Sequence, residues 1–213
     1  SEFIDNSLHS YLANKTNLNE LGINKCESTL LIDVDTEGNE YISIEDNAGG
    51  VHPNDFDRLL SIGVPKEKSE YQLSEFGMGM KTASIWLGNF IEIETKNYNC
   101  NEAYKITIDI SAIGTEKGEV DIIKVLDSSL IPGYTKIKIS QLNRRVKNKT
   151  KKVGVSLASI YKKYIESDDL KISFQNEKLT PQVYTLEQTS DGSEMKKHFK
   201  IILSNGKECN GWI

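Results

Sequence analysis

The strongest constraint on the fold is a series of short stretches in which apolar and polar residues alternate. A period of two places alternate side chains on opposite faces of a β-strand, so each stretch is expected to bury one face. Such strands are typical of an antiparallel sheet that helices cover on one side and water on the other. The stretches are Phe90–Thr95, Tyr104–Ile110, Val120–Val125 and Thr135–Ile139. Because helical patterns precede them, we expect an α+β fold.

The first ninety residues combine helical and strand patterns. Residues 2–13 carry apolar side chains at helical spacing and predict an amphipathic helix, whereas residues 14–25 are polar and are expected to form a loop. The turn residues Glu37–Glu40 predict a hairpin. The remaining expected elements are strands at 29–34 and 41–46, short helices at 53–60 and 82–87, and a polar loop over 61–74.

A second unit is expected to begin near the basic run Arg144–Lys152. Its expected elements are a helix at 155–165 and strands at 170–174, 182–189 and 198–203. We therefore predict two domains, 1–145 and 146–213. The chain lacks an initiating Met and ends on apolar residues, so we expect the second domain to be truncated and the chain to be part of a longer protein.

Composition excludes several classes of protein. A formal net charge of −5 argues against a broadly basic nucleic-acid-binding surface, and the run Arg144–Lys152 is expected to be a solvated loop, with a polyanion contact as the alternative. No stretch approaches the ~20 apolar residues of a membrane span, and no signal peptide is visible. The three cysteines, Cys26, Cys100 and Cys209, are widely spaced, which favours reduced thiols in a cytosolic protein.

Three short motifs carry candidate chemistry, and the first lies at the start of the chain. On a helix, Glu2 and Asn6 are one turn apart on one face, with Asp5 beside them. A glutamate can accept a proton from an attacking water, and an amide oxygen can complete the shell of a Mg²⁺ ion held mainly by phosphates. The alternative is an ordinary solvated helix end.

The second motif, Asp46–Gly50, follows a predicted strand. A carboxylate there can accept a hydrogen bond from an exocyclic amine, while small residues let the backbone approach a flat ring. That combination would select adenine over guanine; the alternative is a turn after a strand.

The third motif, Gly77–Lys81, places two glycines before a helix start. Its backbone amides and the helix dipole would suit phosphate oxygens, although neither the Walker A spacing nor a βαβ context is present. A glycine-rich helix start without a ligand is the alternative.

Together the motifs resemble those of the GHKL ATPase superfamily, which includes gyrase-type ATPases, the heat-shock chaperone ATPase, histidine kinases and mismatch-repair ATPases. The similar segments, in the order of the family motifs, are Glu2–Ser7, Asp46–Gly50, Glu75–Gly79 and Gly133–Ile139. In the last segment Tyr134 is interposed between the glycine and Thr135, unlike the Gly-Thr-x-Ile strand of the family. Within the superfamily, Leu60–Gly63 and Phe76–Ala83 look most like MORC-type ATPases and their bacterial relatives.

The resemblance implies a Bergerat-type two-layer α/β sandwich with a mixed, mostly antiparallel sheet, followed by part of a ribosomal-S5-like transducer domain. It implies that Glu2 is the general base and that Asn6 binds Mg²⁺. Asp46 would bind the adenine amino group. The other implied nucleotide contacts are Gly50, Val51 and Thr135 around the base, and Gly77, Met78, Gly79, Met80 and Lys81 at the phosphates. Residues 61–76 would be the ATP lid.

The implied function is Mg²⁺-dependent ATP binding with slow hydrolysis, which drives lid closure and homodimerisation in a larger, DNA-associated or defence protein. Contact with DNA or a partner protein would use regions outside this chain. The expected location is the cytoplasm or, in a eukaryote, the nucleus. Two alternatives stay open: a phosphotransfer domain of the histidine-kinase type, and a module that binds nucleotide without hydrolysing it.

Overall fold

The structure is a computed structural model that describes residues 1–60, 79–112, 120–127, 130–146, 150–182, 188, 190, 192 and 195–212. The chain divides into two compact units, one from Ser1 to Pro181 and one that begins at Gln182. The predicted loop at 61–74 and most of the predicted strand at 182–189 lie outside the described residues.

The first unit is built on an eight-stranded sheet with the order β5-β4-β3-β6-β2-β1-β7-β8. Neighbouring strands run antiparallel except β1 and β7, which are parallel, with Cys26 opposite Leu170. The strands are β1 (Cys26–Val34), β2 (Glu40–Asp46), β3 (Gly88–Lys96), β4 (Ala103–Asp109), β5 (Asp121–Val125), β6 (Tyr134–Leu142), β7 (Leu170–Phe174) and β8 (Glu177–Lys178). The predicted α+β fold with a mixed, mostly antiparallel sheet is confirmed.

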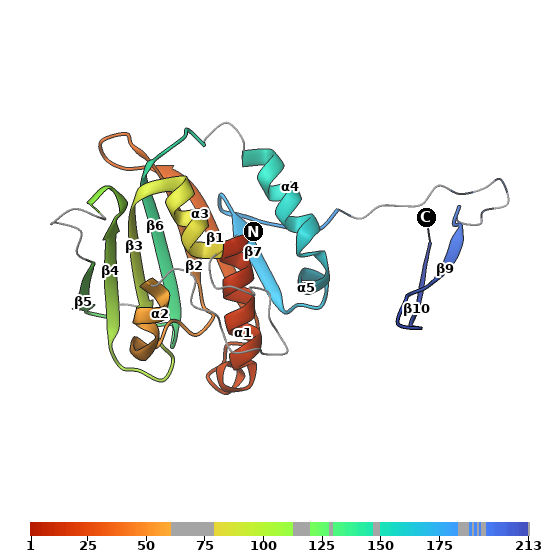
Figure 1. Cartoon of the computed structure of the whole chain (residues 1–213), viewed down its shortest axis with the longest axis horizontal. Helices are drawn as coiled ribbons and strands as arrows, with labels where there is room; N and C mark the ends of the chain where they lie inside the picture. Colours follow the sequence, from red (N-terminus) through yellow and green to blue (C-terminus); the bar gives the residue numbers. More distant parts are fainter. Residues whose placement is uncertain are drawn as a thin grey trace. The chain divides into compact units, whose positions relative to one another are not determined.

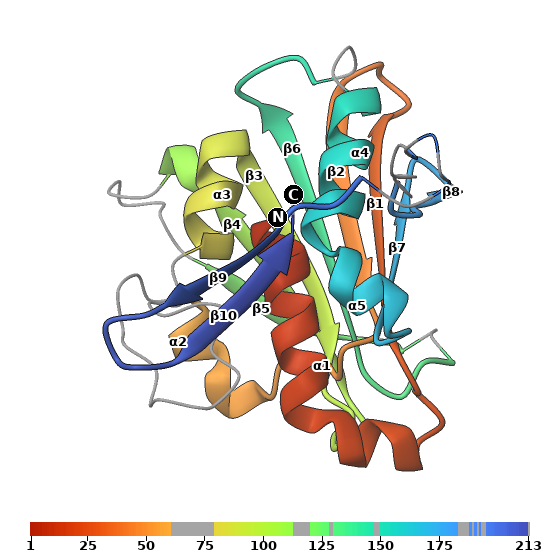
Figure 2. The ribbon, with the colours of Figure 1, turned by 90° about the vertical axis from the view of Figure 1, so that its right-hand side faces the viewer.

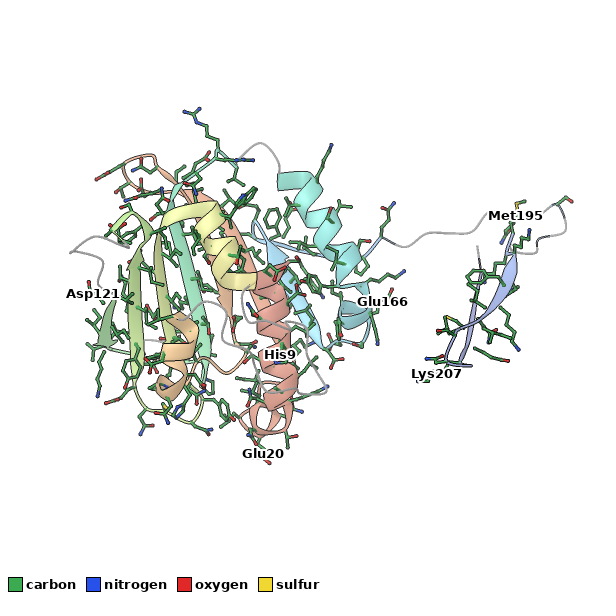
Figure 3. All side chains as sticks on the ribbon, viewed as in Figure 1. His9, Glu20, Asp121, Glu166, Met195 and Lys207 are labelled. Atoms are coloured by element: carbon green, nitrogen blue, oxygen red, sulfur yellow. The ribbon has the colours of Figure 1, made fainter. Side chains whose placement is uncertain are left out.

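The helices of this unit form a second layer, in which α1 lies between α3 and the α4–α5 pair (Figures 1 and 2). They are α1 (Glu2–Glu20), α2 (Phe56–Leu60), α3 (Gly79–Leu87), α4 (Thr150–Ile160) and α5 (Lys162–Glu166), with short 3-10 turns η1 (Pro53–Asp55) and η2 (Ile110–Ala112). Asp121 marks the β5 edge of the sheet, and Glu166 marks the end of α5 on the opposite side (Figure 3).

The two faces of the sheet differ as the alternation predicts. Ile91 and Ile93 on β3 are buried and pack in one cluster with Phe3 of α1. The residues between them point the other way, and there Glu92 is paired with Lys138 and Glu94 with Lys136 in the β3–β6 register. Opposite charges on neighbouring strands suit a solvated face. One face is therefore covered by helices, and the other carries ion pairs.

Helix α1 is longer than the sequence predicts, because it continues through the polar residues 14–20. Leu18 lies in this stretch and is fully buried, so it anchors the last turn to the core. The helix ends at Glu20, and Gly22 follows with φ +84°. The Gly22 amide donates to the Asn19 carbonyl and the Ile23 amide to the Leu18 carbonyl. This glycine-terminated helix end stabilises the extra turns despite their polar composition.

The segment after β6 also differs from the prediction. The single helix expected at 155–165 is two helices that meet at Tyr161. The strand expected at 170–174 is present as β7 and pairs with β1 of the main sheet. Residues 146–181 therefore share a compact unit with the residues before them. The division of the chain into an ATP-binding domain (1–145) and a transducer-like domain (146–213) stays a prediction.

The second unit contains a hairpin of β9 (His198–Ile202) and β10 (Glu208–Trp212). Apolar side chains of β9, among them Phe199 and Ile201, are exposed within the described residues. The predicted strand at 198–203 is confirmed.

Candidate functional site

The candidate site starts from a row of polar residues across neighbouring strands. Asp46 ends β2 and is paired with Thr135 on β6, which is paired in turn with Thr95 on β3. Ser28 on β1 is the partner of Asp46 on its other side. Directly paired residues point to the same face of a sheet, so all four side chains lie on the face that the helices cover. The predicted residues Asp46 and Thr135 are therefore neighbours, 89 positions apart in the sequence.

The Asp46 carboxylate connects this row to α1. Its Oδ2 accepts a hydrogen bond from the Ser7 hydroxyl at 2.8 Å, and its Oδ1 accepts one from the Ala48 amide at 2.9 Å. Ser10, one turn further along α1, donates to the Ala48 carbonyl at 2.7 Å. Two serines of the helix thus fix both the carboxylate and the loop that follows it.

Burial raises the pKa of Asp46 to about 6, against the opposing effect of the hydrogen bonds from Ala48 and Ser7. The carboxyl group is therefore mostly ionised at neutral pH. An ionised carboxylate has about four acceptor positions, of which these two bonds occupy only part. Asp46 can accept a further hydrogen bond from a ligand amine.

The glycines after Asp46 bring three backbone segments into contact. Gly50 has φ +66°, and a β-carbon there would lie 1.9 Å from the Lys96 carbonyl oxygen and 2.8 Å from that of Tyr134. A β-carbon on Gly133 would lie 2.7 Å from the Gly49 carbonyl oxygen. Only glycine fits at these positions without moving the backbone. The close approach explains the glycines of the second and fourth motifs.

Thr95 and Asn97 hold this loop, and the sequence analysis did not identify either. The Thr95 hydroxyl is fully buried; it accepts from the Val51 amide at 2.9 Å and donates to the Tyr134 carbonyl at 3.0 Å. The Asn97 amide donates to the carbonyls of Gly49 and Gly50 at 3.3 Å each. The sequence signal that could have identified them is the period of two: Thr95 and Asn97 continue the alternation of the buried residues Ile91 and Ile93. Val51 thus lies beside the row of polar residues, and its contact with a nucleotide stays a prediction.

Ser28 is the one buried side chain that keeps an unsatisfied polar atom in the part of the chain that the structure describes. The residue Ser28 is 1% exposed, and it is paired with Asp46 on the neighbouring strand. A buried hydroxyl without a partner costs roughly 1–3 kcal/mol, so it calls for a water or a ligand atom. This orphaned hydroxyl is an independent sign that something polar binds beside Asp46.

The first motif lies on the same helix as Ser7. Glu2 is exposed and Asn6 is half-buried, one turn apart, as predicted for a helix. Asp5 points elsewhere, since its carboxylate accepts a hydrogen bond from Tyr161 at 2.7 Å. Because Asn6 directly precedes Ser7, α1 brings the first motif to the Asp46 loop.

The third motif is described in part. Gly77 and Met78 lie outside the described residues, and α3 begins at Gly79, with Met80 and Lys81 in its first turn. Helix α3 packs against α1, which carries Glu2 and Asn6. The helix start that the motif predicts is therefore present beside the first motif, and the phosphate contacts of these five residues stay predictions.

Among the described residues, His, Cys, Asp and Glu do not gather in groups of three that could hold a metal ion. The half-buried Asn6 amide could supply one oxygen to a Mg²⁺ ion held otherwise by phosphates and water, and this role stays a prediction. None of the helices that the structure describes is long and apolar enough to cross a membrane.

We predict that Gly50→Ala lowers the free energy of unfolding by at least about 3 kcal/mol, because the new β-carbon collides with backbone and the φ of +66° is strained. The matched control is Gly38→Ala, where φ is +85° but nothing lies within 4 Å. It should cost only about 1–2 kcal/mol from strain. Urea unfolding measures both, and equal losses would contradict the close approach.

We further predict that Asp46 titrates near pH 6. The folded state binds this proton more tightly than the unfolded state, whose carboxyl has a pKa of about 3.9. The stability that the proton contributes is thus complete below about pH 4 and is lost as the pH rises through about 6. Carboxyl ¹³C NMR of the protein, assigned with Asp46→Asn, gives the midpoint. A midpoint at the ordinary value would contradict burial as the cause.

Residues 1–141 match the family model described as histidine kinase-, DNA gyrase B- and HSP90-like ATPase. None of the curated proteins matches the sequence. Among solved structures, the ATPase and transducer domains of DNA topoisomerase II from Balamuthia mandrillaris align with a TM-score of 0.57 at 13% identity, covering 84% of this chain and 47% of that one.

The ATPase region of Saccharomyces cerevisiae topoisomerase II bound to ICRF-187 aligns with a TM-score of 0.49 at 10% identity, over 81% of this chain and 48% of that one. This chain thus spans about half the length of the topoisomerase structures that it resembles. The first alignment supports the fold, and the family model covers all of α1 through β6 apart from Leu142. The chain belongs to the family of histidine kinase-, DNA gyrase B- and HSP90-like ATPases.

Proposed function

We propose that this chain binds ATP with Mg²⁺ and hydrolyses it slowly, as the ATPase module of a larger protein. The observation that carries the proposal is the half-buried Asp46 carboxylate, which accepts hydrogen bonds from Ser7 and Ala48 and keeps acceptor positions open. Adenine offers an amino group at the position where guanine has a carbonyl oxygen. An ionised carboxylate attracts the first and repels the second, so Asp46 selects adenine.

The surroundings of Asp46 suit an adenine ring. Gly50 lets the backbone come close, and Val51 is fixed beside the row by its hydrogen bond to Thr95. Thr135 lies next to Asp46 and supports the water that bridges the ring to the protein. The unsatisfied Ser28 hydroxyl is a second place for such a water.

The catalytic residues follow on α1. Glu2 is exposed and would accept the proton of the water that attacks the terminal phosphate, with ADP as the leaving group, while the Asn6 side-chain oxygen would help to hold Mg²⁺. Bound Mg²⁺ would neutralise charge on the phosphates. Backbone amides at the start of α3 contact the phosphates; the residues assigned there are Gly77, Met78, Gly79, Met80 and Lys81.

The wider context is also a proposal. Residues 61–76 close over the nucleotide as a lid, and ATP binding favours a homodimer. Residues 146–213 begin a transducer-like domain, for which a match to topoisomerase ATPase and transducer domains is support at the level of fold. We propose a MORC-like protein associated with DNA or defence, acting in the cytoplasm or nucleus.

We predict that a non-hydrolysable ATP analogue binds to the protein in the presence of Mg²⁺, and that Asp46→Asn weakens this binding at least about 100-fold. The amide turns a donor toward the adenine amine and loses the negative charge. Isothermal titration calorimetry measures both. The matched control is Asp121→Asn, at the β5 edge of the sheet, which should bind like the parent (Figure 3). Failure of the parent to bind would refute the proposed function.

We predict that Glu2→Ala keeps the affinity for the analogue and lowers ATP turnover at least about 100-fold, because only the proton acceptor is removed. Phosphate release measures turnover. Glu20→Ala is the control, since Glu20 is an exposed glutamate at the opposite end of the same helix (Figure 3). Equal turnover in Glu2→Ala and the parent would refute Glu2 as the base.

A further inference from the structure

The hydroxyl of Tyr161 contacts the first turn of α1, which carries Glu2. Tyr161 stands between α4 and α5 and is 2% exposed. Its hydroxyl oxygen lies 2.7 Å from Asp5 Oδ1 and 3.0 Å from the Ser1 carbonyl oxygen. The contact therefore joins the helical segment between β6 and β7 to the start of α1.

The chemistry of this contact determines which group donates the hydrogen bond. A phenol has one proton to donate, and the closer acceptor is the Asp5 carboxylate. Burial raises the pKa of Tyr161 well above its ordinary value, and the neighbouring carboxylates of Asp5 and Glu2 add to this effect. The phenol thus stays protonated and acts as the donor, and a hydrogen bond from a hydroxyl to a carboxylate is among the stronger kinds.

Packing fixes the position of the Tyr161 ring. The ring belongs to a buried apolar cluster that joins α1, α4 and β7. Its fully or almost fully buried members include Ile4, Leu8, Leu157, Leu170 and Ile172. A hydroxyl on such a ring is held in place by the packing, so it defines where the segment of α1 that carries Asp5 lies.

Asp5 connects this contact to the candidate catalytic residues of α1. Asp5 is one turn from Glu2 and adjacent to Asn6, so fixing Asp5 fixes the backbone that carries the proposed base and metal ligand.

We propose that Tyr161 is a positioning residue for ATP hydrolysis: through Asp5 its hydroxyl holds the first turn of α1, and with it the Glu2 carboxylate, in the orientation that hydrolysis requires. The proposal rests on the proposed function. In this proposal the position of the Glu2 carboxylate depends on the α4–α5 segment. The Asp46 loop is held separately, by hydrogen bonds from Ser7 and Ser10. Loss of the hydroxyl should therefore affect turnover and spare binding.

Tyr161→Phe tests this, because it removes the hydroxyl and keeps the ring in the cluster. We expect the dissociation constant of the ATP analogue to stay within about twofold and kcat to fall about tenfold, since small misplacements of a catalytic group are costly. Tyr164→Phe is the matched control, because Tyr164 packs against the same cluster from α5 and should leave kcat unchanged. Asp5→Ala should lower kcat to a similar extent, and adding Tyr161→Phe to it should cause little further loss.

A second readout needs no activity. Amide hydrogen exchange at Asp5 and Asn6 should become about tenfold faster in Tyr161→Phe, and not in Tyr164→Phe, because the freed turn opens more often. If parent-like exchange and parent-like kcat both persist in Tyr161→Phe, the positioning role is refuted while the proposed function stands. If the parent neither binds nor hydrolyses ATP, the proposed function fails and the catalytic role of Tyr161 fails with it. Faster exchange would then show a purely structural anchor.

Discussion

The hydrogen bond from Ser7 to the Asp46 carboxylate is the contact on which the rest of the site depends. It attaches α1 to the end of β2 at 2.8 Å and satisfies one oxygen of the half-buried carboxylate. A carboxylate that is partly removed from water is costly unless it accepts hydrogen bonds, so the loop and the helix must both be in place for Asp46 to be tolerated.

Strand register then decides which residues join Asp46. The row of polar side chains takes one residue from each of four neighbouring strands. It forms only because these strands pair in this register, which aligns Ser28 (β1), Asp46 (β2), Thr135 (β6) and Thr95 (β3). A slip of one residue would turn a whole strand over and move its polar group to the solvated face. The close contacts of Gly50 and Gly133 with neighbouring backbone make such a slip harder, since they fit one alignment.

Helix α1 serves two sides of the molecule at once. Ser7 and Ser10 contact the Asp46 loop, whereas Ile4, Asp5 and Leu8 contact the cluster and hydroxyl of the α4–α5 segment. In the proposed function, recognition of adenine and positioning of the Glu2 carboxylate thus depend on different faces of one helix. This separation would give the α4–α5 segment a physical route to influence hydrolysis without changing the affinity for nucleotide.

Much of this protein could be predicted from the sequence alone. Period-two alternation determined the antiparallel strands and their wet and dry faces, and the spacing of Glu2, Asn6, Asp46 and Gly50 indicated the ATPase family, because these features are local along the chain. Local pattern failed where burial overrode composition, as at Leu18 in the polar end of α1, and where β7 joined the sheet through β1. The roles of Ser28, Thr95, Asn97 and Tyr161 could not be read from the sequence. Each depends on partners that are distant along the chain, and only strand register and helix packing bring those partners within hydrogen-bonding distance.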